Sequence, residues 1–284
     1  MTDRHSLAGH DVHRVGYGTM QLPGPGVFGP PADHDGAIAV LRRARELGVD
    51  HFDTSAYYGP WVANDLLREA LHPYQGMTIV SKVGGRRGAD ASWIDASSPP
   101  ELMWGIDENL IGLGVERIDV MNLRLMQVDD PAFDEKLGTM ADAVSAGKIG
   151  AIGLSNVGLR ELDRAAELGI DVACVQNRYA LTFREDEALL RTCGERGIAY
   201  TPFFPLDFGT VPGNAAVIAV ADRVGATPAQ VGLAWLLAHA PNLLVIAGTS
   251  SLAHLEENVA VGDLELSADD LAALDAVEPA RVAA

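Results

Sequence analysis

A unit of helix, glycine and short apolar run recurs along this chain. Five times, a stretch with helical periodicity stops at a glycine and a run of apolar residues follows. Glycine commonly ends a helix, since it lacks the Cβ that clashes in the left-handed conformation. Short apolar runs that alternate with helices are typical of parallel strands covered on both faces. The glycines are Gly48, Gly114, Gly147, Gly169 and Gly197, and the runs after them are 49–53, 115–122, 148–156, 170–177 and 198–204.

The whole pattern predicts an α/β fold, a (β/α)8 or TIM barrel of one domain over residues 1–284. The alternative is an open doubly wound sheet, but no G-x-G-x-x-G turn follows the first predicted strand, and Gly84-Gly85 after the third does not fit that turn. The predicted strands are 15–20, 51–53, 78–82, 118–124, 150–154, 172–176, 199–203 and 243–247, and helical patterns between them include 35–47, 99–113, 133–146, 159–168 and 228–239.

Polar residues follow the predicted strands at the point where each strand ends. In a barrel of this kind the carboxyl ends of the strands share one rim, and active sites are built there. We therefore expect these side chains to converge on one site. They are Asp53, Lys82, Arg124, Ser155 with Asn156, and Gln176 with Asn177.

Three of the residues near this rim form a proton donor when they are brought together. Asp53 ends one apolar run, Tyr58 follows it, and Lys82 ends the next run. A phenol has an ordinary pKa near ~10 and is a poor acid at neutral pH. A nearby ammonium favours the phenolate, and a carboxylate can hold that ammonium in place. We expect Lys82 to lower the pKa of Tyr58, which then protonates a reacting carbonyl oxygen.

Charge and composition exclude several other functions. The net charge of −18 argues against nucleic acid and against an anionic membrane surface as partners. No apolar run is long enough to span a bilayer, and the polar start has no signal core. The only cysteines, Cys174 and Cys193, favour a reducing cytoplasm. The eight histidines and two cysteines show no metal-binding spacing, so no metal is expected. The oligomeric state stays open.

These motifs resemble the aldo-keto reductases over nearly the whole chain. The resemblance implies a (β/α)8 enzyme that reduces a small-molecule aldehyde or ketone with NADPH. It assigns Asp53, Tyr58 and Lys82 to the family's catalytic tetrad. It also implies a set of cofactor-binding residues: Thr19 and Met20 near the nicotinamide; Asp53; Ser155, Asn156 and Gln176 around its carboxamide; Phe203 stacked on its ring; and Gly248, Thr249, Ser250, His254, Glu257 and Asn258 at the adenosine phosphate and adenine.

A narrower resemblance is to bacterial pyridoxal reductases, which reduce the aldehyde of this form of vitamin B6 to pyridoxine with NADPH. It rests on the segments 20–31, 122–124 and 202–206. Phe28, Trp61 and Trp93 fall in expected rim loops, where aromatic walls could hold a flat pyridine ring. Two alternatives stay open: a reductase of another metabolite, and a cofactor-binding regulatory subunit similar to channel β subunits.

Two positions depart from the common family pattern. Arg124 stands where most members have the tetrad histidine. Arginine cannot act as a general acid, but it can stabilise the negative charge that develops on the substrate oxygen, or pair with the phenolate of pyridoxal. His254 stands where many members place an arginine on the cofactor's 2′-phosphate. A neutral imidazole offers less charge there, which keeps NADH open as an alternative to NADPH.

Overall fold

Seven strands form one curved parallel sheet. In the computed structural model, which describes residues 3–279, each strand pairs in parallel with its neighbours in the order β3-β4-β5-β7-β8-β9-β10. Residues 1–2 and 280–284 of the predicted domain lie outside the described residues. The strands are β3 (Tyr17–Gly18), β4 (His51–Asp53), β5 (Thr78–Arg87), β7 (Ile118–Arg124), β8 (Ile149–Ser155), β9 (Val172–Gln176) and β10 (Ala199–Tyr200).

The eighth segment closes this sheet into a barrel. Residues 242–245 lie between β10 and β3 and form parallel bridges to both sides, Leu243 with Tyr200 and Val245 with Val15. The Leu244 amide donates to the Tyr200 carbonyl at 2.9 Å, and the Gly16 amide donates to the Val245 carbonyl at 2.8 Å. The predicted (β/α)8 barrel is confirmed, although its eighth position is joined by isolated bridges.

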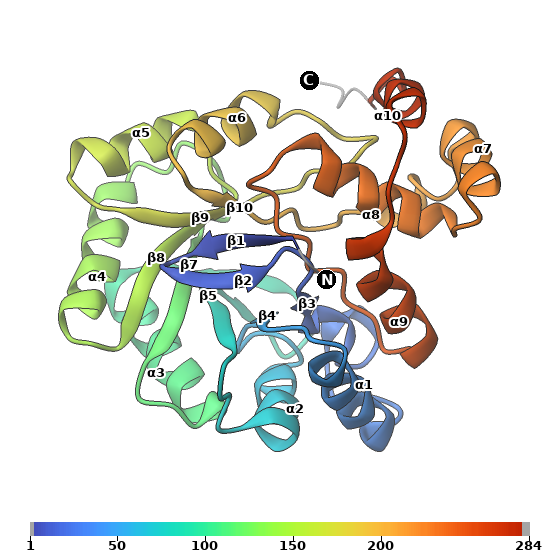
Figure 1. Ribbon diagram of the computed structural model, residues 1–284. Coiled ribbons are helices and arrows are strands. Elements are labelled where there is room, and N and C mark those ends of the chain that lie inside the picture. Colours follow the sequence, from blue (N-terminus) through green and yellow to red (C-terminus); the bar gives the residue numbers. More distant parts are fainter. Residues whose placement is uncertain (1–2, 280–284) are drawn as a thin grey trace.

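Helices surround the strands, as Figure 1 shows. The five predicted helical patterns are confirmed as α1, α3, α4, α5 and α8, and the five predicted glycine stops all have positive φ angles, from 70° to 93°. Reciprocal side-chain caps at Ser98 and Thr227 begin α3 and α8. The helices are α1 (His34–Glu46), α2 (Val62–Leu71), α3 (Pro99–Leu113), α4 (Phe133–Ser145), α5 (Leu159–Glu167), α6 (Glu187–Glu195), α7 (Ala215–Val224), α8 (Pro228–His239), α9 (Leu252–Ala260) and α10 (Ala268–Asp275), with 3-10 turns η1 (Thr19–Gln21), η2 (Pro25–Val27), η3 (Asp207–Gly209) and η4 (Val261–Asp263).

Several strand boundaries differ from the sequence prediction. The first predicted strand, 15–20, is regular only at Tyr17–Gly18, because the chain turns into η1. The seventh, 199–203, is regular only at Ala199–Tyr200. The third runs beyond residue 82 to Arg87, because it pairs in an antiparallel hairpin with β6 (Trp93–Ala96). Trp93 therefore lies in a strand and not in the expected loop.

A second hairpin, absent from the sequence prediction, covers one end of the barrel. Its strands are β1 (Arg4–Leu7) and β2 (His10–His13), and in Figure 1 it crosses the centre of the ring of strands. Leu7 and Val12 point into the same small apolar cluster as Val80, Val120 and Cys174 from the barrel strands. The hairpin therefore supplies apolar side chains to the barrel interior.

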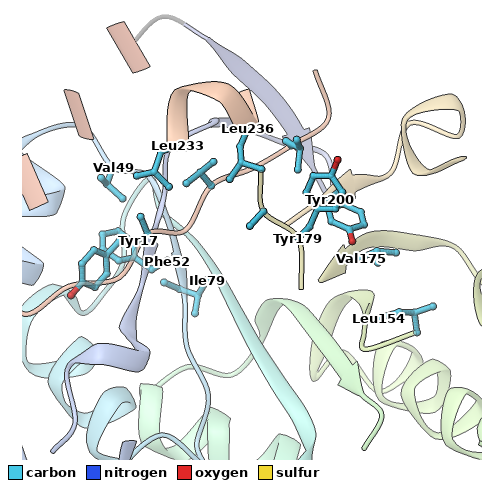
Figure 2. Close-up of a cluster of buried hydrophobic side chains, with 14 of the residues drawn as sticks. Tyr17, Val49, Phe52, Ile79, Leu154, Val175, Tyr179, Tyr200, Leu233 and Leu236 are labelled. Atoms are coloured by element: carbon cyan, nitrogen blue, oxygen red, sulfur yellow. The ribbon is translucent and has the colours of Figure 1, made fainter. Parts of the chain in front are cut away.

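The larger core lies between the strands and the helices. Figure 2 shows part of it, with Tyr17 close to Phe52 and Tyr179 close to Tyr200. The ring centroids of these pairs are 6.2 Å and 6.0 Å apart. Trp235 of α8 is fully buried here. Within residues 3–279, no helix is long and apolar enough to cross a membrane.

Candidate active site

Asp53, Lys82 and Tyr58 meet beside the carboxyl end of β4: Asp53 ends this strand, Tyr58 follows it, and Lys82 lies within the neighbouring strand β5. The Lys82 Nζ donates hydrogen bonds to Asp53 Oδ1 and to the Thr54 carbonyl, the latter at 3.1 Å. The same ammonium lies 5.0 Å from the centroid of the Tyr58 ring. All three side chains are buried. The sequence-predicted convergence of these residues is therefore present in the structure.

The pKa of Tyr58 differs from the sequence expectation. It is raised above the usual value for tyrosine, first because burial disfavours the phenolate and second because the Asp53 carboxylate repels it. The positive charge of Arg124 opposes both effects. Lys82 was expected to lower this pKa, but its ammonium is paired with Asp53, so burial prevails. Tyr58 consequently holds its proton at neutral pH.

Gln176, the last residue of β9, completes the buried polar group around Asp53. Its Nε2 donates to Asp53 Oδ2 at 2.9 Å, so both carboxylate oxygens are occupied. Its Oε1 is buried and has no hydrogen-bond partner among residues 3–279. A buried, unpaired amide oxygen at a cavity wall is available to a ligand that donates an N–H.

Arg124, the last residue of β7, lies beside Tyr58 at the same rim. Its Nη1 donates to Ser155 Oγ at 3.2 Å, and its guanidinium carbon lies 4.9 Å from the centroid of the Phe203 ring. Arginine stays charged at any physiological pH. This position therefore places a permanent positive charge between the serine at the end of β8 and an aromatic face.

A cavity of about 390 Å³ opens beside Tyr58 and runs toward α9. A Cβ added to Gly248 would lie 2.2 Å from the Gly18 carbonyl oxygen, and one added to Gly18 would lie 2.7 Å from the Ile246 carbonyl oxygen. Only glycines allow the two backbones to come this close. Several predicted cofactor-binding residues line this cavity: Met20, Asp53, Gln176, Phe203, Gly248 and Asn258.

The other predicted cofactor-binding residues lie around the same rim. Thr19 is buried and donates to Thr54, while Asn156 has a φ of 58° and donates through Nδ2 to the Leu125 carbonyl at 2.8 Å. The remainder follow the chain from Gly248 into α9, where the Ser251 side chain accepts a hydrogen bond from the His254 amide. Ser250 and His254 are exposed there, and Thr249, Glu257 and Asn258 are half-buried.

The aromatic residues predicted to contact substrate separate into two places. Phe28 and Trp93 both lie near Arg87, whose guanidinium carbon is 5.5 Å and 4.0 Å from their ring centroids. Trp61 instead lines a different cavity, on the outer side of β5, and its indole donates to Glu108 at 3.3 Å. Phe28 and Trp93 thus share Arg87 as a neighbour, and Arg87 also lines the cavity to which Trp61 belongs.

The sequence analysis missed the residues that support the Tyr58 segment. Asn109 of α3 accepts hydrogen bonds from the Ala56 amide at 3.0 Å and from Ser81 Oγ at 2.6 Å. Asn64 of α2 accepts from Thr54 at 2.8 Å. Both asparagines are fully buried in helices. Asparagine is a poor helix former, so a polar residue on an apolar helix face was the available signal.

A (β/α)8 barrel with a buried lysine–aspartate pair and a tyrosine at the carboxyl-end rim defines a class of barrel oxidoreductases. Within that class, the chain belongs to the aldo/keto reductase family, whose sequence pattern matches residues 14–279. It is therefore an oxidoreductase. Among the residues that the structure describes, no three His, Cys, Asp or Glu side chains are grouped to hold a metal ion.

Similar proteins agree with this family. The chain is 47% identical to pyridoxine 4-dehydrogenase of Escherichia coli K12 over 278 residues, which cover 96% of this chain and 97% of that enzyme. A crystal structure of the thermostable aldo-keto reductase Tm1743 with the inhibitor epalrestat has a TM-score of 0.81, 26% identity, and coverage of 96% and 98%. An aldo-keto reductase of Klebsiella pneumoniae in complex with NADPH shares the fold, at a TM-score of 0.79 and 23% identity over 97% and 94% of the chains.

Proposed function

We propose that this enzyme reduces pyridoxal to pyridoxine with NADPH. The observation that carries the choice of substrate is the 47% identity, over nearly the full length of both chains, to an enzyme named pyridoxine 4-dehydrogenase. The two names describe opposite directions of one reaction. Membership of the aldo/keto reductase family supports the reduction of a carbonyl group. The sequence segments that resemble those of pyridoxal reductases support pyridoxal as the substrate.

Tyr58 is the proton donor in this proposal. Burial and the Asp53 carboxylate raise its pKa, so the phenol is protonated in the resting enzyme. An alkoxide is a much stronger base than a phenolate, and it can take this proton as the carbonyl is reduced. Lys82, fixed by Asp53, then lies 5.0 Å from the ring and stabilises the phenolate that remains.

The cavity beside Tyr58 fits a nicotinamide cofactor, which when bound supplies the hydride that reduces the carbonyl carbon. The unpaired Gln176 Oε1 is an acceptor for the carboxamide N–H of the nicotinamide, and Ser155 and Asn156 lie at the adjacent strand end. Phe203 offers an aromatic face. Gly18 and Gly248 let two backbone segments pack closely against one another at the wall of this cavity.

The cofactor's phosphate end would lie at the start of α9. Thr249, Ser250 and His254 precede or begin this helix, whose N-terminal dipole attracts anions. Glu257 and Asn258 follow one turn later, next to the expected adenine position. The Klebsiella structure shows that this fold can hold NADPH. NADH remains the alternative because His254 brings no permanent charge.

Arg124 is the group proposed to recognise the substrate oxygens. Its charge lies beside Tyr58 and over the Phe203 ring, where negative charge develops during reduction. Pyridoxal also carries a phenolic oxygen next to its aldehyde, and a guanidinium can pair with that oxygen as the phenolate. Phe28 and Trp93, held together by Arg87, are proposed as an aromatic wall for the pyridine ring.

The proposal is tested by following NADPH oxidation with purified enzyme, using pyridoxal and an aromatic aldehyde without the hydroxyl group. A kcat/KM for pyridoxal that is at least tenfold higher supports the assignment. Similar values for both aldehydes would mean that the enzyme is a reductase of another metabolite. Turnover of neither, with NADPH still bound, would favour a cofactor-binding regulatory subunit.

A further inference from the structure

The segment between β3 and α1 forms a loop on the rim that carries the candidate active site. We call residues 23–31 the rim loop. Val27 packs against a buried cluster that contains Tyr58, and the Phe28 backbone forms a parallel bridge with Gly59. The rim loop therefore contacts the short stretch of chain that carries the proposed proton donor.

Two backbone hydrogen bonds join the rim loop to that stretch. The Gly29 amide donates to the Gly59 carbonyl at 3.0 Å, and the Gly59 amide donates to the Val27 carbonyl at 3.2 Å. Gly59 directly follows Tyr58 in the chain. The position of the rim loop is therefore linked to the chain beside Tyr58 through backbone contacts. Hydrogen exchange at these two amides reports whether the loop is closed.

Val27 has a backbone conformation that is unfavourable for its side chain. Its φ of 59° lies in the left-handed region, where a β-branched residue is rarely found because its Cβ crowds the backbone. Strain of this kind persists only where the surrounding structure holds the residue, and it gathers at functional sites. Contacts from outside the rim loop must therefore offset the strain at Val27.

Arg87 of β5 supplies such contacts. Its Nη1 donates to the Val27 carbonyl at 3.0 Å, and its Nη2 donates to the Gly26 carbonyl at 2.9 Å. The same guanidinium donates to the Ala91 carbonyl, from Nε at 3.2 Å and from Nη2 at 2.7 Å. Ala91 lies in the turn between β5 and β6. Hydrogen bonds from a charged donor are roughly twice as strong as those between neutral groups, so this one side chain fixes the rim loop to the hairpin.

The other surroundings of Arg87 agree with this role. Its guanidinium carbon lies 4.0 Å from the centroid of the Trp93 ring and 5.5 Å from that of Phe28. Trp93 also packs edge-on against Tyr57, with ring centroids 5.7 Å apart. Within residues 3–279, every hydrogen bond of Arg87 goes to a backbone carbonyl, and no carboxylate pairs with it. The position of this arginine is therefore explained by the loop and the turn that it joins, and not by an ion pair.

We propose that Arg87 is a positioning residue, which holds the rim loop closed against the Tyr58 stretch so that the loop selects the aldehyde. In this role Arg87 acts through Val27 and Phe28 and not by contact with the substrate. The closed loop keeps Phe28 near Trp93, and these are the two rings assigned above to the wall for a flat substrate. Without Arg87, the strain at Val27 favours an open loop, and a ring-shaped aldehyde loses one of its walls. The choice of pyridoxal as the test aldehyde rests on the proposed function, whereas the position of the loop does not.

Amide hydrogen exchange, measured by NMR without any ligand, tests the position of the loop. Arg87→Met removes the charge and the donors. Exchange at Gly29 and Gly59 should accelerate roughly tenfold more than exchange at Leu154 in β8, because the loop opens while the barrel stays folded. Arg86→Met is the matched control: it removes a charge from the same hairpin, but Arg86 is exposed and donates no hydrogen bond to the rim loop within residues 3–279. Similar acceleration at Leu154, or in Arg86→Met, would overturn the proposal.

Steady-state kinetics test the selection of substrate. Arg87→Met should raise the KM for pyridoxal roughly fivefold. It should leave unchanged both the affinity for NADPH and the KM for propanal, an aldehyde too small to need the wall. Arg87→Lys keeps the charge but not the fork of donors, so its KM for pyridoxal should lie between those of the wild type and Arg87→Met. An unchanged KM for pyridoxal in Arg87→Met would overturn the selective role. If the wild-type enzyme turns over no pyridoxal, the proposed function fails, and faster exchange at Gly29 and Gly59 still supports the role of Arg87 in holding the loop.

Discussion

The surroundings of Tyr58 keep its phenol protonated. Burial and the Asp53 carboxylate raise the pKa of Tyr58, and Asp53 holds the Lys82 ammonium 5.0 Å from the centroid of the Tyr58 ring. The sequence pattern predicted that these three side chains meet. The direction of the pKa shift was not predictable, because desolvation depends on how completely the ring is covered by other parts of the chain. Residues distant in sequence also act here: Arg124 opposes the rise in the pKa of Tyr58, and Gln176 donates a hydrogen bond to Asp53.

Replacement of Tyr58 by phenylalanine tests its role directly. Tyr58→Phe removes the proposed proton donor and keeps the ring, so kcat is expected to fall by roughly 10²- to 10⁴-fold. NADPH binding, measured by fluorescence titration, should change little. Tyr74→Phe is the control, since its hydroxyl donates to the Leu113 carbonyl, away from the rim. Full activity in Tyr58→Phe would rule out the assignment.

Arg124 is expected to determine which aldehydes are accepted. Arg124→Gln keeps a hydrogen-bond donor and removes the charge. The ratio of kcat/KM for pyridoxal to that for pyridine-4-carboxaldehyde, which lacks the hydroxyl group, should fall roughly ten- to a hundredfold, since a hydrogen bond to a charged group contributes about 1.5–3 kcal/mol. Steady-state kinetics with both aldehydes measure this ratio. An unchanged ratio would show that Arg124 does not recognise the phenolate.

At the scale of single elements, the sequence was most informative where a local rule decides the structure. The glycine stops and the apolar runs correctly located most strands and five of the helices, because chain reversal after a helix requires a residue tolerant of positive φ. The two hairpins were missed. The strands β1, β2 and β6 are only four residues long, and their pairing depends on partners that the sequence pattern does not identify.

The close backbone contact between β3 and the segment after residue 247 yields an element-scale prediction. Gly248→Ala places a Cβ 2.2 Å from the Gly18 carbonyl oxygen, so the backbone must move. We expect at least tenfold weaker NADPH binding and a lower melting temperature. Gly138→Ala in α4 is the matched control, because nothing lies within 4 Å of its added Cβ. That change should raise stability by about 0.5–1 kcal/mol. Unchanged cofactor affinity in Gly248→Ala would contradict the proposed cofactor position.

For the molecule as a whole, a buried histidine in β4, His51, makes the free energy of unfolding depend on pH. His51 is buried beneath Gly16, and neither ring nitrogen has a hydrogen-bond partner among residues 3–279. Burial lowers the pKa of His51 to about 4, although the Asp50 carboxylate opposes this shift. The unfolded chain binds a proton below pH ~6.5, whereas the folded protein does so only near pH 4. The contribution of neutral His51 to the free energy of unfolding is therefore complete above pH ~6.5 and is lost as the pH falls toward 4.

Denaturant unfolding at several pH values checks this expectation. Between pH 7 and pH 5 the free energy of unfolding should fall by about 2 kcal/mol through this group. His51→Gln should flatten that dependence, even if it lowers stability at every pH. His34→Gln, on the exposed surface of α1, should leave the slope of the wild-type curve unchanged. Parallel curves for the wild type and His51→Gln would contradict the predicted origin of the effect.

The closure of the barrel by isolated bridges has a mechanical consequence. A ring of strands loosens first where the fewest hydrogen bonds join neighbours, and here that place is the segment 242–246 between β10 and β3. Amide hydrogen exchange should therefore be faster at residues 244 and 245 than in β7 or β8. The cavity beside Tyr58 is lined by Ile246, Ala247 and Gly248, the continuation of the same segment. A molecule bound there would stabilise the segment that closes the barrel. Binding in this cavity would therefore make the whole barrel more rigid.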